Sequence, residues 1–116
     1  MGMSANIMIG SEFELSDKLL NYFIRYHGLQ WEDEFKDQYK EFDWEMGLRS
    51  LGYENLLYGR MCGGKLQIFC FADDNYDGEA KIDWINKMAK KLESWGSSLA
   101  KKYKSKHRVI LFPYVG

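Results

Sequence analysis

The sequence has little of several features that mark special classes of protein. Its 116 residues include one proline and two cysteines, which gives no basis for a proline-rich linker or a disulfide framework. Uninterrupted apolar runs such as Val109–Phe112 are far shorter than the roughly 18 residues that a membrane span needs. Sixteen basic and seventeen acidic residues leave a net charge of -1, so the whole chain has no general attraction to nucleic acid or membranes. We therefore expect a cytoplasmic protein without a membrane attachment.

The sequence does contain enough apolar material for one core. Hydrophobic residues make up 46% and aromatic residues 16%, so we expect residues 1–116 to form a single domain. The start of the chain is unusual, because Met1 and Gly2 precede a second methionine. The sequence of residues 10–15 is also the translation of three adjacent cloning sites. A vector origin for part of residues 1–15 stays open.

The first third of the chain predicts a short strand followed by a helix. Asn6–Ile9 is brief and apolar, and Ser11 with Glu14 three residues later matches a helix capping box. Gly28 supplies a stop signal for this helix. At 100° per residue, one face of the helix collects Leu15, Leu19, Leu20, Phe23, Ile24, Tyr26 and His27.

A second helix is predicted from Gln30 to a point before Gly52. Its apolar residues recur at spacings of three and four, which is the pattern of one helical face. This stripe consists of Trp31, Phe35, Tyr39, Phe42 and Met46.

A β-hairpin is predicted over 54–62 and 65–72. The two runs flank Gly63-Gly64, a dipeptide that tolerates both positive φ angles of a type I′ turn. A two-residue turn pairs Met61 with Leu66 on a wholly apolar face. The opposite face is aromatic at one end and polar near the turn.

The last third predicts one long helix, 79–103, followed by a strand, 107–114. The apolar face of the helix keeps its phase through Gly96, so we expect this glycine to be a point of close contact with a sheet. The fold class is therefore α+β, with a small mixed or antiparallel sheet around the central hairpin. Counting the first two helices as one crossover gives the order βαββαβ, the split βαβ or ferredoxin-like arrangement.

The cysteines and histidines indicate no catalytic or metal centre. The hairpin register separates Cys62 and Cys70 by more than a disulfide spans, so we expect reduced thiols. We interpret His27 as a core histidine with a hydrogen-bond partner and His107 as part of a basic tail. We expect no cofactor, and the sequence favours a protein that is not an enzyme.

One weak metal candidate follows the hairpin. Asp73, Asn75, Asp77 and Gly78 match the opening of a calcium loop, but its twelfth position, which needs a bidentate glutamate, is Trp84. We interpret the segment as a solvated turn. A metal-dependent enzyme that adds Glu79 to Asp73 and Asp77 is the third of three functional hypotheses.

The first hypothesis is a non-catalytic protein-binding module of the inhibitor, immunity or adaptor type. Residues 1–58 have a net charge of -6, and acidic residues repeat every four positions on the predicted second helix beside an outward tryptophan. Such a surface suits a partner with a basic face, or a second copy in a homodimer. Its residues are Asp33, Asp37, Glu41, Trp44 and Glu45.

The alternative is single-stranded nucleic-acid binding. Residues 59–116 have a net charge of +5, and between residues 86 and 108 there are eight basic residues and one acid, Glu93. Aromatic side chains on an open sheet face would stack on bases while lysines contact phosphate. The sheet residues of this hypothesis are Tyr58, Arg60, Lys65, Phe69 and Phe71, and the helix residues are Lys87, Lys90, Lys91, Lys101 and Lys102.

Overall fold

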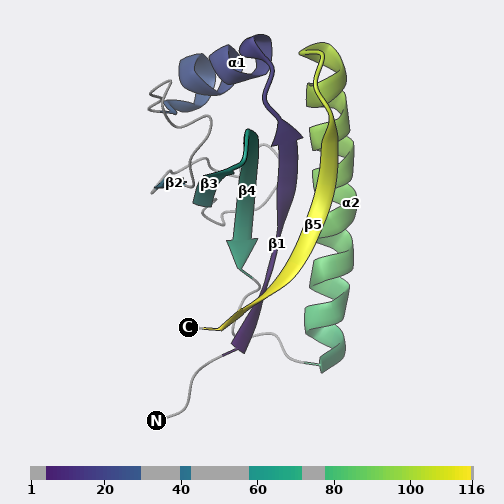
Figure 1. Ribbon diagram of the computed structural model, residues 1–116. Coiled ribbons are helices and arrows are strands. Elements are labelled where there is room, and N and C mark those ends of the chain that lie inside the picture. The colour runs from purple at the N-terminus through teal and green to yellow at the C-terminus, as the bar shows by residue number, and fades with distance from the viewer. Residues whose placement is uncertain (1–4, 30–39, 43–57, 72–77, 116) are drawn as a thin grey trace.

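A computed structural model describes residues 5–29, 40–42, 58–71 and 78–115 of the protein (Figure 1). The described residues form an antiparallel sheet in the strand order β2-β3-β4-β1-β5, together with two helices. The strands are β1 (Ala5–Glu14), β2 (Lys40–Phe42), β3 (Tyr58–Cys62), β4 (Lys65–Phe71) and β5 (His107–Val115). The helices are α1 (Asp17–His27) and α2 (Gly78–Lys102).

The predicted hairpin is confirmed over β3 and β4. Gly63 and Gly64 both have positive φ angles, 59° and 80°, as the type I′ turn requires. Met61 lies opposite Leu66 in the predicted register, and both side chains are fully buried. The pairs expected at 54–57 lie outside the described residues.

β1 is longer than expected and lies inside the sheet. The helix start predicted at Ser11 and Glu14 is wrong, because the strand continues to Glu14. Ser11 is paired with Ile68 on one side and with Val109 on the other. A strand with two neighbours satisfies its backbone N–H and C=O groups through the ladders, so no side-chain cap is needed there.

α1 begins later, after Ser16. The Ser16 hydroxyl accepts a hydrogen bond from the Leu19 N–H at 3.1 Å, and it donates to the Tyr103 carbonyl oxygen at 2.7 Å. This residue therefore caps α1 and also ties it to the end of α2. Gly28 ends the helix with a φ of 68°, as the stop signal predicts. The buried face is narrower than expected, since Ile24 and Tyr26 are both exposed.

The predicted second helix is wrong at residues 40–42, which form the edge strand β2. β2 is antiparallel to β3 and places Glu41 opposite Arg60 in the register. β2 pairs with a strand that is distant in the sequence. Hydrogen bonds to such a strand can override the helical preference that the apolar stripe indicates. The rest of the predicted helix, 30–39 and 43–51, lies outside the described residues. The element order therefore contains a strand where the prediction has only helix.

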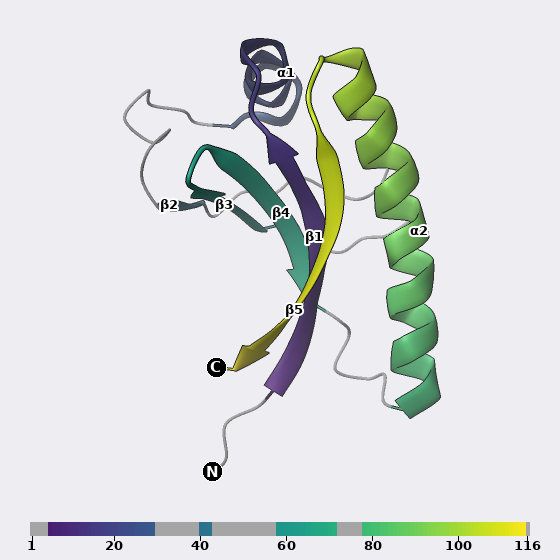
Figure 2. The ribbon, with the colours of Figure 1, turned by 45° about the vertical axis from the view of Figure 1, so that its right-hand side comes forward.

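α2 confirms the predicted long helix and the role of Gly96. An ideal Cβ on Gly96 would collide with the ring of His107, the first residue of β5. The glycine therefore lets the helix approach β5 closely. Figure 2 shows α2 running along the sheet beside β1 and β5. Among the described residues, no helix combines the length and apolar character that crossing a membrane requires.

The hydrophobic core lies between α2, α1 and one face of the sheet. Alternate β1 residues, Ile9 and Phe13, point into it and meet Met88 and Leu92 of α2 in one buried cluster. The intervening residue of β1, Glu12, points to the opposite face. The sheet thus has a core face, on the side of α2, and a second face.

The register of β3 and β4 keeps the two cysteines apart. Cys62 pairs with Lys65, five residues before Cys70 on β4. At roughly 3.3 Å per residue this separation is far longer than the Cα distance that a disulfide spans, so Cys62 and Cys70 cannot form a disulfide with each other in this register.

Gly96→Ala should destabilise the protein, although alanine favours helices. The added methyl group collides with the His107 ring, and overpacking of this kind costs about 1–3 kcal/mol. Urea unfolding followed by circular dichroism measures the change. Ser94→Ala, on the exposed face of α2, is the control and should stay within about 0.5 kcal/mol of the wild type. Equal stability of G96A and the wild type would contradict this packing.

Candidate functional site

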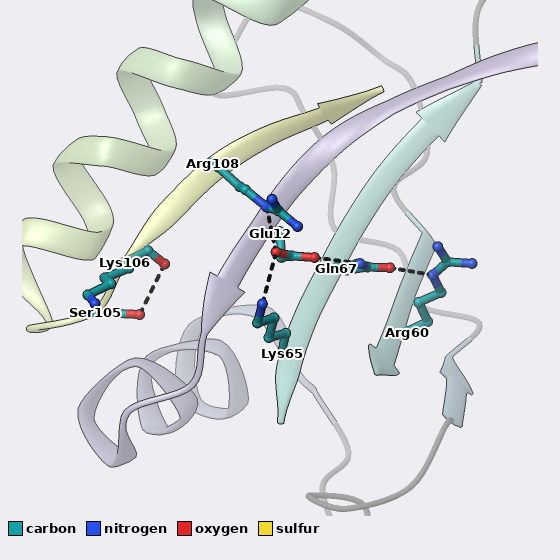
Figure 3. Close-up of polar contacts among 7 residues, drawn as sticks. All are labelled: Glu12, Arg60, Lys65, Gln67, Ser105, Lys106 and Arg108. Carbon is teal, nitrogen blue, oxygen red and sulfur yellow. Dashed lines mark hydrogen bonds and ion pairs between the residues drawn. The ribbon is translucent and has the colours of Figure 1, made fainter. Parts of the chain in front are cut away.

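Four polar side chains form a row across the second face of the sheet (Figure 3). Arg108, Glu12, Gln67 and Arg60 come from the neighbouring strands β5, β1, β4 and β3, and we call them the polar row. The Glu12 carboxylate accepts hydrogen bonds from Nε of Arg108 at 2.7 Å and from Nε2 of Gln67 at 2.6 Å. Gln67 Oε1 accepts from Nε of Arg60 at 2.5 Å. Lys65 Nζ lies 3.8 Å from Glu12 Oε1.

The strand register brings the polar row together. Glu12 lies opposite Arg108 on one side and opposite Gln67 on the other, and Gln67 lies opposite Arg60. Directly opposite residues of antiparallel strands point to the same face with their Cβ atoms close enough to interact. Four residues distant in sequence therefore form one continuous hydrogen-bonded chain.

Glu12 is the buried member of the polar row, with a side chain that is 7% exposed. Burial alone opposes the charged carboxylate and raises its pKa. The hydrogen bonds from Gln67 and Arg108, together with the positive charges of Arg108 and Lys65, outweigh burial and lower the pKa of Glu12 below its ordinary value. Glu12 is therefore ionised at neutral pH.

A surface pocket of about 290 Å³ lies at one end of the polar row. Its charged lining comprises three cations, Lys65, Lys106 and Arg108, and two carboxylates, Glu12 and Glu14. Because Glu12 already contacts Lys65 and Arg108, it lowers the charge of the pocket while holding both cations in place. The pocket is thus a weakly basic, solvent-open site.

The lysines predicted on the outer face of α2 are all exposed. The basic residues that follow the helix, in the turn and at the start of β5, are exposed as well. We call this set the basic surface, and it consists of Lys87, Lys90, Lys91, Lys101, Lys102, Lys104, Lys106 and Arg108. The one acid between them, Glu93, accepts a hydrogen bond from the Ser97 hydroxyl at 2.8 Å.

The structure separates the two halves of the predicted nucleic-acid surface. Arg60 and Phe69 lie on the second face of the sheet, whereas α2 covers the core face and directs its lysines away from the sheet. Only the last members of the basic surface, Lys106 and Arg108, also reach the pocket beside the polar row. The basic surface and the sheet residues therefore do not form one flat platform.

The sheet aromatics support base stacking less than the sequence suggested. The predicted stacking role of Phe69 is not supported, because this residue is only 8% exposed and the Arg60 guanidinium carbon lies 5.5 Å from its ring centroid. The side chains of Tyr58 and Phe71 lie outside the described part of the chain, although both residues belong to the hairpin strands.

The acidic residues of the first hypothesis are mostly untested by the structure. Asp33, Asp37, Trp44 and Glu45 lie outside the described ranges. Glu41 is described only by its backbone, in β2 opposite Arg60. A continuous acidic helix through this residue is therefore wrong.

His107 does not belong to a solvated basic tail, as the sequence suggested. Its side chain is 1% exposed and packs against Gly96 and Phe13, whose ring centroid lies 4.8 Å away. Among the described residues neither ring nitrogen has a hydrogen-bond partner, and Glu93 Oε2 lies 4.0 Å from Nδ1. Burial lowers the pKa of His107, and the charge of Glu93 offsets part of this effect.

His27 has the expected hydrogen-bond partner, but it is half-buried and lies at the margin of the core rather than within it. Its Nε2 lies 2.9 Å from the hydroxyl of Tyr22, and its ring meets Phe23 at a centroid distance of 5.9 Å. Burial lowers the pKa of this histidine too. The residue thus joins an aromatic cluster that includes Tyr103 of the α2 end.

The metal candidate receives no structural test. Asp73, Asn75 and Asp77 lie outside the described ranges, and Glu79 is exposed at the start of α2. Within the described ranges, no three histidine, cysteine, aspartate or glutamate side chains are grouped so as to hold a metal ion.

Sequence reasoning missed Glu12 and Gln67 as members of a site. It placed Glu12 in the first turn of a helix, where a carboxylate is unremarkable. The available signal was alternation, since Glu12 and Glu14 alternate with the apolar residues Phe13 and Leu15, and a period of two indicates a strand.

Comparisons with protein-family models, curated proteins and solved structures found no match for this chain.

Glu12→Gln should reduce stability most strongly at neutral pH. The variant loses the charge that holds Arg108 and Lys65, at a cost of about 1–3 kcal/mol. In the wild type this contribution is fully present above the ordinary glutamate pKa of 4.5, and it is lost as pH falls through the lowered pKa of the folded state. Urea unfolding between neutral and acidic pH should therefore show a shallower acid dependence for E12Q. Glu14→Gln, at an exposed position, should retain the wild-type profile.

The ring of His107 should titrate below the ordinary histidine pKa of 6.5. Because the unfolded chain binds the proton more readily, His107 should make stability decrease as pH falls from 6.5 toward the lowered pKa of the folded state. NMR titration of the imidazole resonances measures this pKa directly. Glu93→Gln should lower the pKa further, since it removes the nearby negative charge. A pKa at or above the ordinary value would exclude the buried placement.

Proposed function

We propose that this protein is a non-catalytic module that binds single-stranded nucleic acid through its basic surface. The observation that supports the proposal most is the exposure of all eight basic residues between 86 and 108, interrupted only by Glu93. Each exposed ammonium or guanidinium group that neutralises a phosphate releases a condensed counterion, which favours binding at low salt. The near-neutral chain thus concentrates positive charge along the outer side of α2 and in the turn and strand start that follow it.

The lysines of α2 suit an extended, phosphate-lined ligand. From Lys87 to Lys102 the helix rises by roughly 22 Å, and its five outer lysines share one face. Small Ser94 and Ser98 lie between the two groups of lysines and leave the backbone of a ligand room to approach. Binding of this kind reads backbone charge and has little sequence preference.

The pocket beside the polar row extends the proposed binding surface. Lys106 and Arg108 follow the helix and line the pocket together with Lys65. Glu12 fixes the Arg108 side chain, so the guanidinium has a defined position before any ligand arrives. A phosphate contact made there needs less ordering of the protein than a contact with a lysine in solvent.

For the fold, we propose the ferredoxin-like arrangement of β5, β1, β4 and β3, with β2 added beyond β3. The strand order and the antiparallel pairing of these four strands support this proposal. The protein-docking hypothesis also stays a proposal. Its test is the capture of a basic partner by two folded variants, Trp44→Ala and a variant that reverses the charges of Asp37 and Glu41. Unchanged capture by both variants would exclude that surface.

Removing two lysines from the basic surface should weaken nucleic-acid binding. Fluorescence anisotropy with a labelled single-stranded oligonucleotide at low and moderate salt measures the affinity. The double variant Lys90→Gln with Lys101→Gln should raise the Kd by at least about tenfold at low salt and reduce the salt slope by about one per lost contact.

The matched control removes two charges elsewhere. Lys18→Gln with Arg25→Gln changes the net charge equally but alters exposed residues of α1, outside the basic surface. It should leave the salt slope unchanged. Absence of binding by the wild type at low salt, or equal weakening by both double variants, would refute the proposed surface.

A further inference from the structure

We propose that the outer edge of β5 pairs with β5 of a second copy of this chain, so that two sheets become one continuous antiparallel sheet. In the sheet formed by residues 5–14, 40–42, 58–71 and 107–115, β5 is the edge strand next to β1, and it has nine residues. This inference goes beyond the proposed nucleic-acid binding and does not rest on it. A strand edge is a row of backbone donors and acceptors that another strand satisfies best.

The hydrogen-bond pattern shows which groups of β5 face outward. The Glu14 N–H donates to the Lys106 carbonyl oxygen at 3.0 Å, which makes this opposite pair a hydrogen-bonded one. Pairs alternate along an antiparallel ladder, so even-numbered residues of β5 bond to β1 and odd-numbered residues direct their N–H and C=O groups to the open edge. Pro113, which has no N–H, lies at an odd position, as this pattern requires.

The middle of β5 combines this open edge with exposed apolar surface. Leu111 is 56% exposed, although it lies opposite the fully buried Ile9 and on the same face of the sheet. Figure 2 shows the C-terminal part of β5 turning away from α2. The C-terminal part of β5 therefore extends beyond the cover of α2.

The sequence of β5 suits pairing with itself. A two-fold axis at Ile110 places Val109 of one copy opposite Leu111 of the other, and both residues present outward backbone groups. In this register Arg108 lies opposite Phe112, so the two copies do not bring like charges together across the interface. Pro113 falls near the end of the new ladder, where its missing donor costs little.

The geometry fixes the relation between the two copies. Antiparallel edge pairing needs a two-fold axis perpendicular to the sheet, so the same face of each copy lies on the same side. Both α2 helices then cover one side of the combined sheet, and both polar rows lie on the other.

Sedimentation velocity over a range of concentrations tests the pairing. The wild type should form a species of twice the 13.7 kDa chain mass at concentrations up to about 100 µM. Leu111→Lys should raise the dimer dissociation constant by at least about tenfold, because it places a charge at the new interface. Ile82→Lys is the matched control, since Ile82 is similarly exposed but lies on α2, and it should dimerise like the wild type.

Hydrogen exchange localises the interface. The amide protons of Val109 and Leu111 should exchange more slowly as protein concentration rises, and this protection should disappear in L111K. Circular dichroism confirms that both variants are folded. A wild type that stays monomeric would overturn the proposal. The edge of β5 would then be a candidate for pairing with a strand of another protein. A dimer that L111K does not weaken, or that leaves the β5 amides unprotected, would overturn it as well.

Discussion

The register of β1 is the constraint on which the rest of the structure depends. β1 pairs with β4 on one side and with β5 on the other, and its alternation sends Ile9 and Phe13 to the core and Glu12 to the opposite face. A slip of one residue would exchange these faces, burying a carboxylate under α2 and exposing two core side chains. The core and the polar row are therefore two consequences of one pairing.

The packing of α2 against the start of β5 is the second constraint. Gly96 admits the ring of His107, and Ser16 joins the cap of α1 to the end of α2. These contacts hold the apolar side of the helix to the sheet, so its lysines are left in solvent. The basic surface is thus a product of the same packing that forms the core. Its charge is local, and the net charge of the chain conceals it.

Several elements were predictable because their signals are local. Gly63-Gly64 requires a tight hairpin turn, and the phase of the apolar face across Gly96 requires one long helix. The capping-box signal at Ser11 is equally local but wrong, because the two strands beside β1 satisfy its backbone. The helical stripe through Phe42 fails for a related reason, since residues 40–42 pair with β3. Local sequence patterns mispredict the secondary structure wherever a strand distant in the sequence satisfies the backbone hydrogen bonds.

The sequence by itself determined the fold class, the hairpin with its register, the long final helix and the lysines on its outer side. Each of these follows from hydrophobic periodicity or from the conformations that glycine allows. Both signals involve only residues that are close together in the sequence. Only the tertiary structure decided that Glu12 lies between Arg108 and Gln67, that His107 is buried beneath Gly96, and that β5 is the last strand of the sheet that the described residues form. These features depend on which strands become neighbours, and that choice is made by long-range packing of side chains separated by dozens of residues.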